Sequence, residues 1–146
     1  MNALRAGFFR NRTSGWLAVV TAVLRILCGV AFILAGAAKF ADLGTTTAGF
    51  VAAGYPDSPV IPFLVALLEV VAGLMLVVGL GTRLAALGLG IVMIGATIAN
   101  AMTMPPFIPA TVLLFVFLAY LLWAGPGKAA LDSRILAKQA GTTAHA

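Results

Sequence analysis

Two charged residues lie inside long apolar runs, where charges are uncommon. Glu69 follows eight uncharged residues (61–68) and precedes thirteen more (70–82). Arg25 interrupts the first apolar run nine residues after Trp16. A charged side chain at the centre of a membrane span costs about 2.5–3.5 kcal/mol on insertion scales, so it is usually kept for a partner or a function. This acid and this base are therefore the first candidates for chemistry.

The expected depths of Arg25 and Glu69 in the membrane are close enough for the two side chains to meet. At 1.5 Å per residue, Arg25 lies ~13.5 Å from Trp16 and Glu69 lies ~18 Å from Gly81, the ends of the two runs that we expect on the same side of the membrane. An arginine side chain spans the ~4.5 Å offset. Helical side chains lean toward the N-terminus of their helix, which draws these two groups apart. Lys39 would meet Glu69 only if the loop that follows the first run (39–59) dipped toward the interior of the membrane. The alternative to a reactive site is a structural ion pair that fixes helix register.

Helical spacing gathers further candidates on the face of the first run that carries Arg25. Steps of about 100° return to this face every three to four residues. Small residues on it allow close helix approach, which indicates a face turned into a bundle. The residues that share the face with Arg25 are Gly29, Phe32, Gly36 and Lys39.

Composition places the chain in a lipid bilayer. Of its 146 residues, 62% are hydrophobic and 9% charged, and the mean hydropathy is +1.12. Soluble domains carry about 25% charged residues, so this chain belongs to another class. The pI of about 10.2 comes from basic residues that flank the apolar runs. A nucleic-acid partner would need a basic face on a soluble domain, so we do not expect one.

Four continuous apolar runs predict an all-α, four-helix membrane domain at 16–124, since a span needs about 20 residues. The predicted spans are 16–38, 60–81, 84–102 and 107–124. A basic N-terminus (1–15) precedes them, an outer loop (39–59) joins the first two, and a basic tail (125–146) with a disordered end follows. A short helix ending at Gly54 is expected inside the loop, because glycine commonly ends helices.

Basic residues predict the orientation. Seven of them flank the N-terminus, the second connection and the C-terminus, whereas Lys39 is the one basic residue of the first and third connections. The positive-inside rule then places both termini in the cytoplasm of a multi-pass protein. A cleaved signal peptide is the competing interpretation of the N-terminus, but Arg25 breaks its apolar segment, which then continues too far for that model.

Cysteine and histidine counts limit intrinsic redox chemistry. Cys28 is the single cysteine and His145 the single histidine, one residue from the end. A CxxC dithiol is therefore excluded, and so is haem bound within the bundle by histidine. The usual ligands of a zinc or copper site are also lacking. We expect no metal and no intrinsic cofactor, and interpret Cys28 as a packing residue.

The order of these residues resembles the DoxX family of small four-helix bacterial membrane proteins. The resemblance rests on three segments and covers roughly residues 24–124. Its most specific part is the acidic residue of the second span, followed by spaced glycines that lead into Thr-Arg. The segments are Arg25…Gly29…Phe32…Gly36-Ala-Ala-Lys39-Phe40, then Gly54-Tyr-Pro56, then Glu69-Val-Val-Ala-Gly73-Leu-Met-Leu-Val-Val-Gly79-Leu-Gly-Thr82-Arg83.

The resemblance implies a location in the bacterial plasma membrane and an accessory or scaffold role in a membrane complex. The kind of complex that it implies is a redox complex linked to quinone or thiol chemistry and to oxidant defence. It establishes no catalytic residue. Glu69, Arg25 and Lys39 are the catalytic candidates, and the candidates for quinone binding are Arg25, Phe32, Lys39, Glu69 and Arg83.

Three functional hypotheses follow. The first is an accessory subunit or scaffold with protein partners in or on the membrane, and with no activity as a stand-alone enzyme. The second is a quinone-binding oxidoreductase subunit in which Glu69 relays a proton and quinone is a substrate rather than a cofactor. Transport of a small molecule or ion by a homo-oligomer is the weakest, because four unbroken helices make a poor carrier unless they dimerise.

Overall fold

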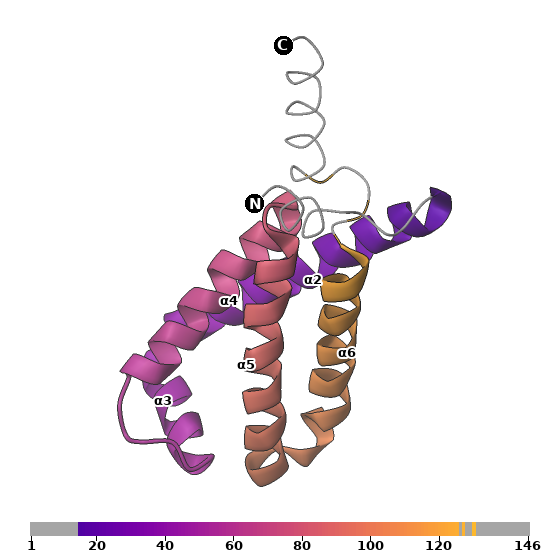
Figure 1. Ribbon diagram of the computed structural model, residues 1–146. Coiled ribbons are helices and arrows are strands. Elements are labelled where there is room, and N and C mark those ends of the chain that lie inside the picture. Colours follow the sequence, from indigo (N-terminus) through magenta and orange to yellow (C-terminus); the bar gives the residue numbers. More distant parts are fainter. Residues whose placement is uncertain (1–14, 126, 128–129, 131–146) are drawn as a thin grey trace, which may run out of the picture.

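The computed structural model describes residues 15–125, 127 and 130, and Figure 1 shows the arrangement of its helices. Their order is α2 (Gly15–Ala41), α3 (Leu43–Ala52), α4 (Val60–Val78), α5 (Thr82–Thr103), the 3-10 turn η1 (Pro105–Phe107) and α6 (Ile108–Ala124). Across this part of the chain there is no strand. The predicted basic N-terminus and most of the predicted tail, including its disordered end, lie outside the described residues.

Four of these segments are long and apolar enough to cross a membrane: Gly15–Ala41, Val60–Val78, Thr82–Thr103 and Pro105–Ala124. The predicted all-α, four-span architecture is therefore confirmed. Many large apolar side chains point outward, including Trp16 and Leu113 at 72% and 70% exposure. In a bilayer these side chains face lipid tails, which solvate them as well as a protein core does.

Glycines hold α2 and α4 close together. A Cβ added to Gly29 would lie 2.7 Å from the carbonyl oxygen of Gly73, and one added to Gly73 would lie 2.8 Å from that of Gly29. About two turns further along α2, a Cβ on Gly36 would lie 2.7 Å from the carbonyl oxygen of Ala66. Backbones approach this closely only where side chains are absent, so the glycine face predicted on the first run is an interface with α4.

A tight turn joins α4 to α5 and lies earlier than the sequence predicted. The predicted second span ends at residue 81 and the third begins at residue 84, but α4 ends at Val78 and α5 begins at Thr82. Gly79 and Gly81 both have left-handed backbones, with φ of 74° and 56°. Since glycine adopts positive φ without steric cost, the chain reverses at the two glycines, and Thr82 and Arg83 form the start of α5.

The helices α5 and α6 stand side by side, and α6 also contacts α2 (Figure 1). Thr97 on α5 donates a hydrogen bond to the hydroxyl of Thr111 on α6 over 2.9 Å. The hydroxyls of Thr21 on α2 and Tyr120 on α6 are 3.0 Å apart. Such interhelical hydrogen bonds replace the hydrophobic driving force that lipid cannot supply between helices.

The predicted outer loop is largely helical. Lys39 belongs to the last turn of α2, which extends to Ala41, and α3 follows after one residue. Asp42 caps α3, because its carboxylate accepts a hydrogen bond from the backbone N–H of Thr45 at 2.9 Å. This hydrogen bond lowers the pKa of Asp42 from its ordinary value. Gly54 then adopts a φ of 88° just after α3, in agreement with the expected helix end.

Candidate functional site

Glu69 forms an ion pair with Lys39. The Nζ atom of Lys39 lies 2.6 Å from Oε2 of Glu69, and the two side chains are 26% and 3% exposed. We expected that Lys39 could meet Glu69 only if the loop after the first span dipped inward. In the structure α2 extends to Ala41 and carries Lys39 in its last turn, so the ion pair forms without such a movement. Gly36, one turn before Lys39, brings α2 against α4 so closely that its added Cβ would lie 3.2 Å from Cβ of Glu69.

Arg25 does not meet Glu69, which corrects that hypothesis. Its guanidinium lies against Gly79, where an added Cβ would collide with it. Gly79 is ten residues beyond Glu69, or ~15 Å along α4. The side chains separate because each leans toward the start of its own helix, and the two helices run in opposite directions. Arg25 thus sits at the C-terminal end of α4, where the helix dipole favours a cation.

A cavity of about 990 Å³ opens beside the ion pair. Residues of α2, α3, α4, α5 and α6 line it, together with the connections that follow α3 and α5. Among the described residues that form its wall, Lys39 and Glu69 carry the charges, and most of the others are apolar. A large apolar cavity with few polar groups is the usual form of a site for a small lipophilic molecule.

Three of the five residues expected to bind a quinone lie on this wall: Phe32, Lys39 and Glu69. The other two, Arg25 and Arg83, lie outside the cavity. Arg83 donates a hydrogen bond from Nη2 to the backbone carbonyl of Trp123 at 3.3 Å, near the end of α6. The structure therefore places Glu69 and Lys39 together on the cavity wall and keeps them apart from Arg25 and Arg83.

Five polar residues of the wall were not among the candidates: Thr46, Tyr55, Asn100, Thr103 and Thr111. Tyr55 follows α3, and Asn100 lies near the end of α5. An asparagine within an apolar run is itself a signal, because polar side chains are uncommon in spans. Tyr55 belongs to the Gly54-Tyr-Pro56 segment of the family resemblance, but tyrosine is common at membrane interfaces, so the sequence did not indicate a place in the cavity.

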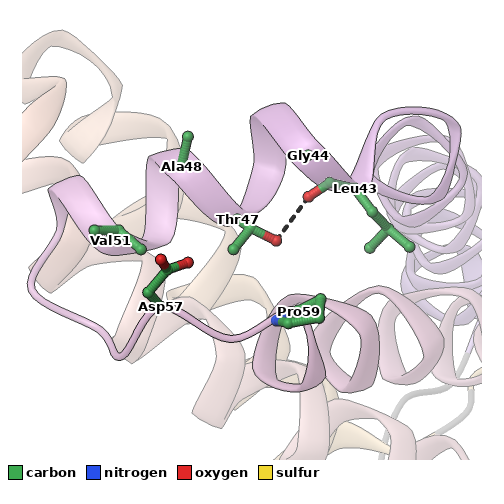
Figure 2. Close-up of a pocket in the computed structure, with 7 residues that line it drawn as sticks. All are labelled: Leu43, Gly44, Thr47, Ala48, Val51, Asp57 and Pro59. Carbon is green, nitrogen blue, oxygen red and sulfur yellow. Dashed lines mark hydrogen bonds between the residues drawn. The ribbon is translucent and has the colours of Figure 1, made fainter.

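A second, more open hollow of about 550 Å³ lies between α3 and the segment that leads into α4 (Figure 2). Asp57 and Pro59 form one side of it, and residues of α3 form the other. Thr47, on the α3 side, donates its hydroxyl hydrogen bond to the carbonyl of Leu43 at 2.7 Å, as the dashed line in Figure 2 marks. The acidic side chain of this hollow, Asp57, has no basic residue beside it in the lining. The hollow is therefore a less specific site than the cavity beside Lys39 and Glu69.

Metal-ligating residues do not gather in the described part of the chain: no three His, Cys, Asp or Glu side chains come together there. Cys28 is 6% exposed and packs in the main apolar cluster with Phe32 and Leu76. This position agrees with the packing role that we expected for the thiol. The expectation that the protein has no metal or intrinsic cofactor stays a prediction.

These features define a class: a four-span helical membrane protein whose bundle holds an ion-paired, apolar cavity. Within that class the chain belongs to the DoxX family, whose model matches residues 20–102. The match includes Lys39 and Glu69 and ends within α5, so it is shorter than the resemblance drawn from the sequence, which extended to residue 124. Comparisons with curated proteins and with solved structures give no match.

Proposed function

We propose that this protein is an accessory subunit of a redox complex in the bacterial plasma membrane, and that it binds the head group of a lipid-soluble quinone in its cavity. The observation that carries the proposal is the Lys39–Glu69 ion pair on an apolar cavity wall. A cavity that held only lipid tails would not need a charge pair, which is costly at membrane depth.

Lys39 is suited to the oxygen of a quinone. Its ammonium has three N–H donors, and the contact with Glu69 uses one of them. The remaining donors are available to a carbonyl oxygen in the cavity. The apolar wall suits the ring and the tail of the same molecule. The volume of about 990 Å³ is at the upper end of the range for small-molecule sites, roughly 300–1,000 Å³.

Glu69 is suited to proton transfer. Reduction of a quinone to a quinol takes up two electrons and two protons. Glu69 would take up one proton from water and pass it to the carbonyl oxygen, and the second proton would come directly from water. The electrons would come from a partner subunit. A single cysteine cannot form the dithiol pair that carries electrons in thiol enzymes, and this chain has one cysteine and one histidine. Lys39 would hold the carbonyl while Glu69 moves a proton toward its oxygen.

The first test is purification of the protein in mild detergent, followed by extraction of quinone and identification of bound proteins. We expect quinone to accompany the wild-type protein and to be lost from Lys39→Met. Arg83→Gln is the matched control, because it removes a cation that lies outside the cavity. A stable protein partner without quinone would instead support a scaffold with no ligand of its own.

The second test separates relay from scaffold at Glu69. A relay must change its charge during turnover, so the nearly isosteric Glu69→Gln should abolish quinone-dependent activity of the complex while assembly persists. A scaffold pair must keep its charge, so the same substitution should lower assembly and leave activity per assembled complex unchanged. Activity divided by the amount of assembled complex distinguishes the two outcomes.

A further inference from the structure

The cavity has polar groups at a second place, on the side of α5. Tyr55 and Asn100 both line it. Neither the hydroxyl of Tyr55 nor the carboxamide of Asn100 makes a hydrogen bond to any residue that the structure describes. Both side chains are half-buried, so their polar groups can be reached from the cavity. In an apolar cavity a polar group gains free energy when it finds a hydrogen-bond partner, so these two groups are suited to bind a polar ligand.

Tyr55 is held in position by its neighbours. Its ring packs against that of Phe50, with centroids 5.3 Å apart and planes inclined at 54°. Its hydroxyl oxygen reaches α5 at Gly95, where an added Cβ would lie 3.4 Å from it. A larger residue than glycine at this position would crowd the phenol. The hydroxyl oxygen therefore lies against the α5 wall, and the packing of the ring against Phe50 restricts the side chain, which lowers the entropy cost of binding a ligand.

Asn100 extends the same wall outward. It follows Gly95 by five residues, which is ~7.5 Å along α5. Its carboxamide offers both donors and an acceptor, and the phenol of Tyr55 can donate or accept. The ion pair, by contrast, is formed by side chains of α2 and α4. The cavity therefore presents hydrogen-bonding groups from two different sides.

We propose that Tyr55 and Asn100 form a second polar contact and select a ligand with two oxygen functions, one for Lys39 and one for the α5 wall. This inference rests on the proposed quinone site and deepens it, because it names residues that distinguish a ring with two carbonyls from an amphiphile with one oxygen. Glu69 and Lys39 hold one end of the head group, and Tyr55 and Asn100 hold the other.

The test measures binding of two probes to the full-length protein in nanodiscs. Decylubiquinone has two ring carbonyls, and para-decylphenol has one oxygen. Tyr55→Phe and Asn100→Leu should each weaken decylubiquinone binding about three- to tenfold, as expected for loss of one neutral hydrogen bond. Binding of para-decylphenol should change less than about twofold in both variants, because its one oxygen bonds to Lys39.

Tyr120→Phe is the matched control. It removes the hydroxyl of the other tyrosine, which bonds to Thr21 outside the cavity. It should leave the affinity for both probes unchanged, and thermal unfolding of all variants in detergent checks that the fold persists. Equal weakening for the two probes, or none for either, would overturn the inference.

The outcomes also separate this inference from the proposed function. If wild-type protein binds decylubiquinone and Lys39→Met abolishes binding while Tyr55→Phe and Asn100→Leu do nothing, the second contact is wrong and the quinone site stands. If wild-type protein binds no decylubiquinone, both fail.

Discussion

The two members of the ion pair differ in exposure, so loss of either partner should have a different cost. Glu69 is 3% exposed and Lys39 is 26% exposed. Lys39→Met should leave a buried carboxylate and lower the free energy of unfolding by up to about 3–5 kcal/mol, the range for breaking a buried pair. Glu69→Gln should cost less, because the freed ammonium reaches a more polar region through its flexible stem.

Unfolding by SDS in mixed micelles measures these free energies. The double variant Lys39→Met with Glu69→Gln should recover much of the loss, since no uncompensated charge remains. Additive losses in this double-mutant cycle would show that the two side chains do not stabilise each other. A larger cost for Glu69→Gln than for Lys39→Met would contradict the order of costs expected from their exposure.

At the same scale, the sequence identified Glu69 but not its partner. The charge inside an apolar run could be recognised without a structure, whereas the choice between Arg25 and Lys39 depended on two facts that are not local. One is the length of α2, which carries Lys39 beyond the predicted end of the span. The other is the closeness of α2 to α4 at Gly36. Tyr55 entered the site through the path of the chain after α3, which no spacing rule predicts.

The helix pair α2–α4 depends on glycine at its crossing. Gly73→Ala places a Cβ 2.8 Å from the backbone oxygen of Gly29. Because backbone cannot move as a side-chain end can, we expect a loss of about 1–3 kcal/mol in the free energy of unfolding. Gly90→Ala is the matched control on α5, where the nearest atom, on Phe115, lies 3.9 Å from the added Cβ.

Alanine at position 90 should be neutral or stabilising, since it favours a helix over glycine by up to about 1 kcal/mol. The same micelle titration compares the two variants. Similar effects at positions 73 and 90 would contradict the close crossing of α2 and α4.

The short helix α3 should respond to pH through its cap. The hydrogen bond from Thr45 lowers the pKa of Asp42, so the charged cap stabilises α3 above the ordinary aspartate pKa. This stabilisation is lost as the pH falls through the lowered pKa. In an NMR titration, the Thr45 amide should shift with a midpoint below 3.8, the unshifted value for Asp42. Asp42→Ala should abolish the transition, and a midpoint at or above 3.8 would exclude the cap.

The elements themselves were largely predictable. Continuous apolar runs revealed the four spans, and Gly54 marked the end of α3. The turn between α4 and α5 was predicted a few residues too late, because hydropathy does not distinguish Gly79 from the apolar residues around it. Only the left-handed backbone of Gly79 in the structure shows that α4 ends there.

For the whole molecule, the distribution of basic residues predicts the orientation in the membrane. With Cys28→Ala as background, a single cysteine at Ala48 on α3 should react with a membrane-impermeant maleimide on intact cells. A single cysteine at Thr142 should react only after lysis. The reverse pattern would invert the topology and place the cavity on the cytoplasmic side.

The central claim is that the cavity beside Lys39 and Glu69 holds a quinone head group, and photolabelling tests it most directly. A photoreactive azidoquinone is irradiated with the purified protein in nanodiscs, and the labelled peptides are identified by mass spectrometry. We predict labels on cavity residues of α3 and α5, removed by excess decylubiquinone and by Lys39→Met. Labels confined to lipid-facing side chains such as Leu113, and unaffected by decylubiquinone, would contradict the account.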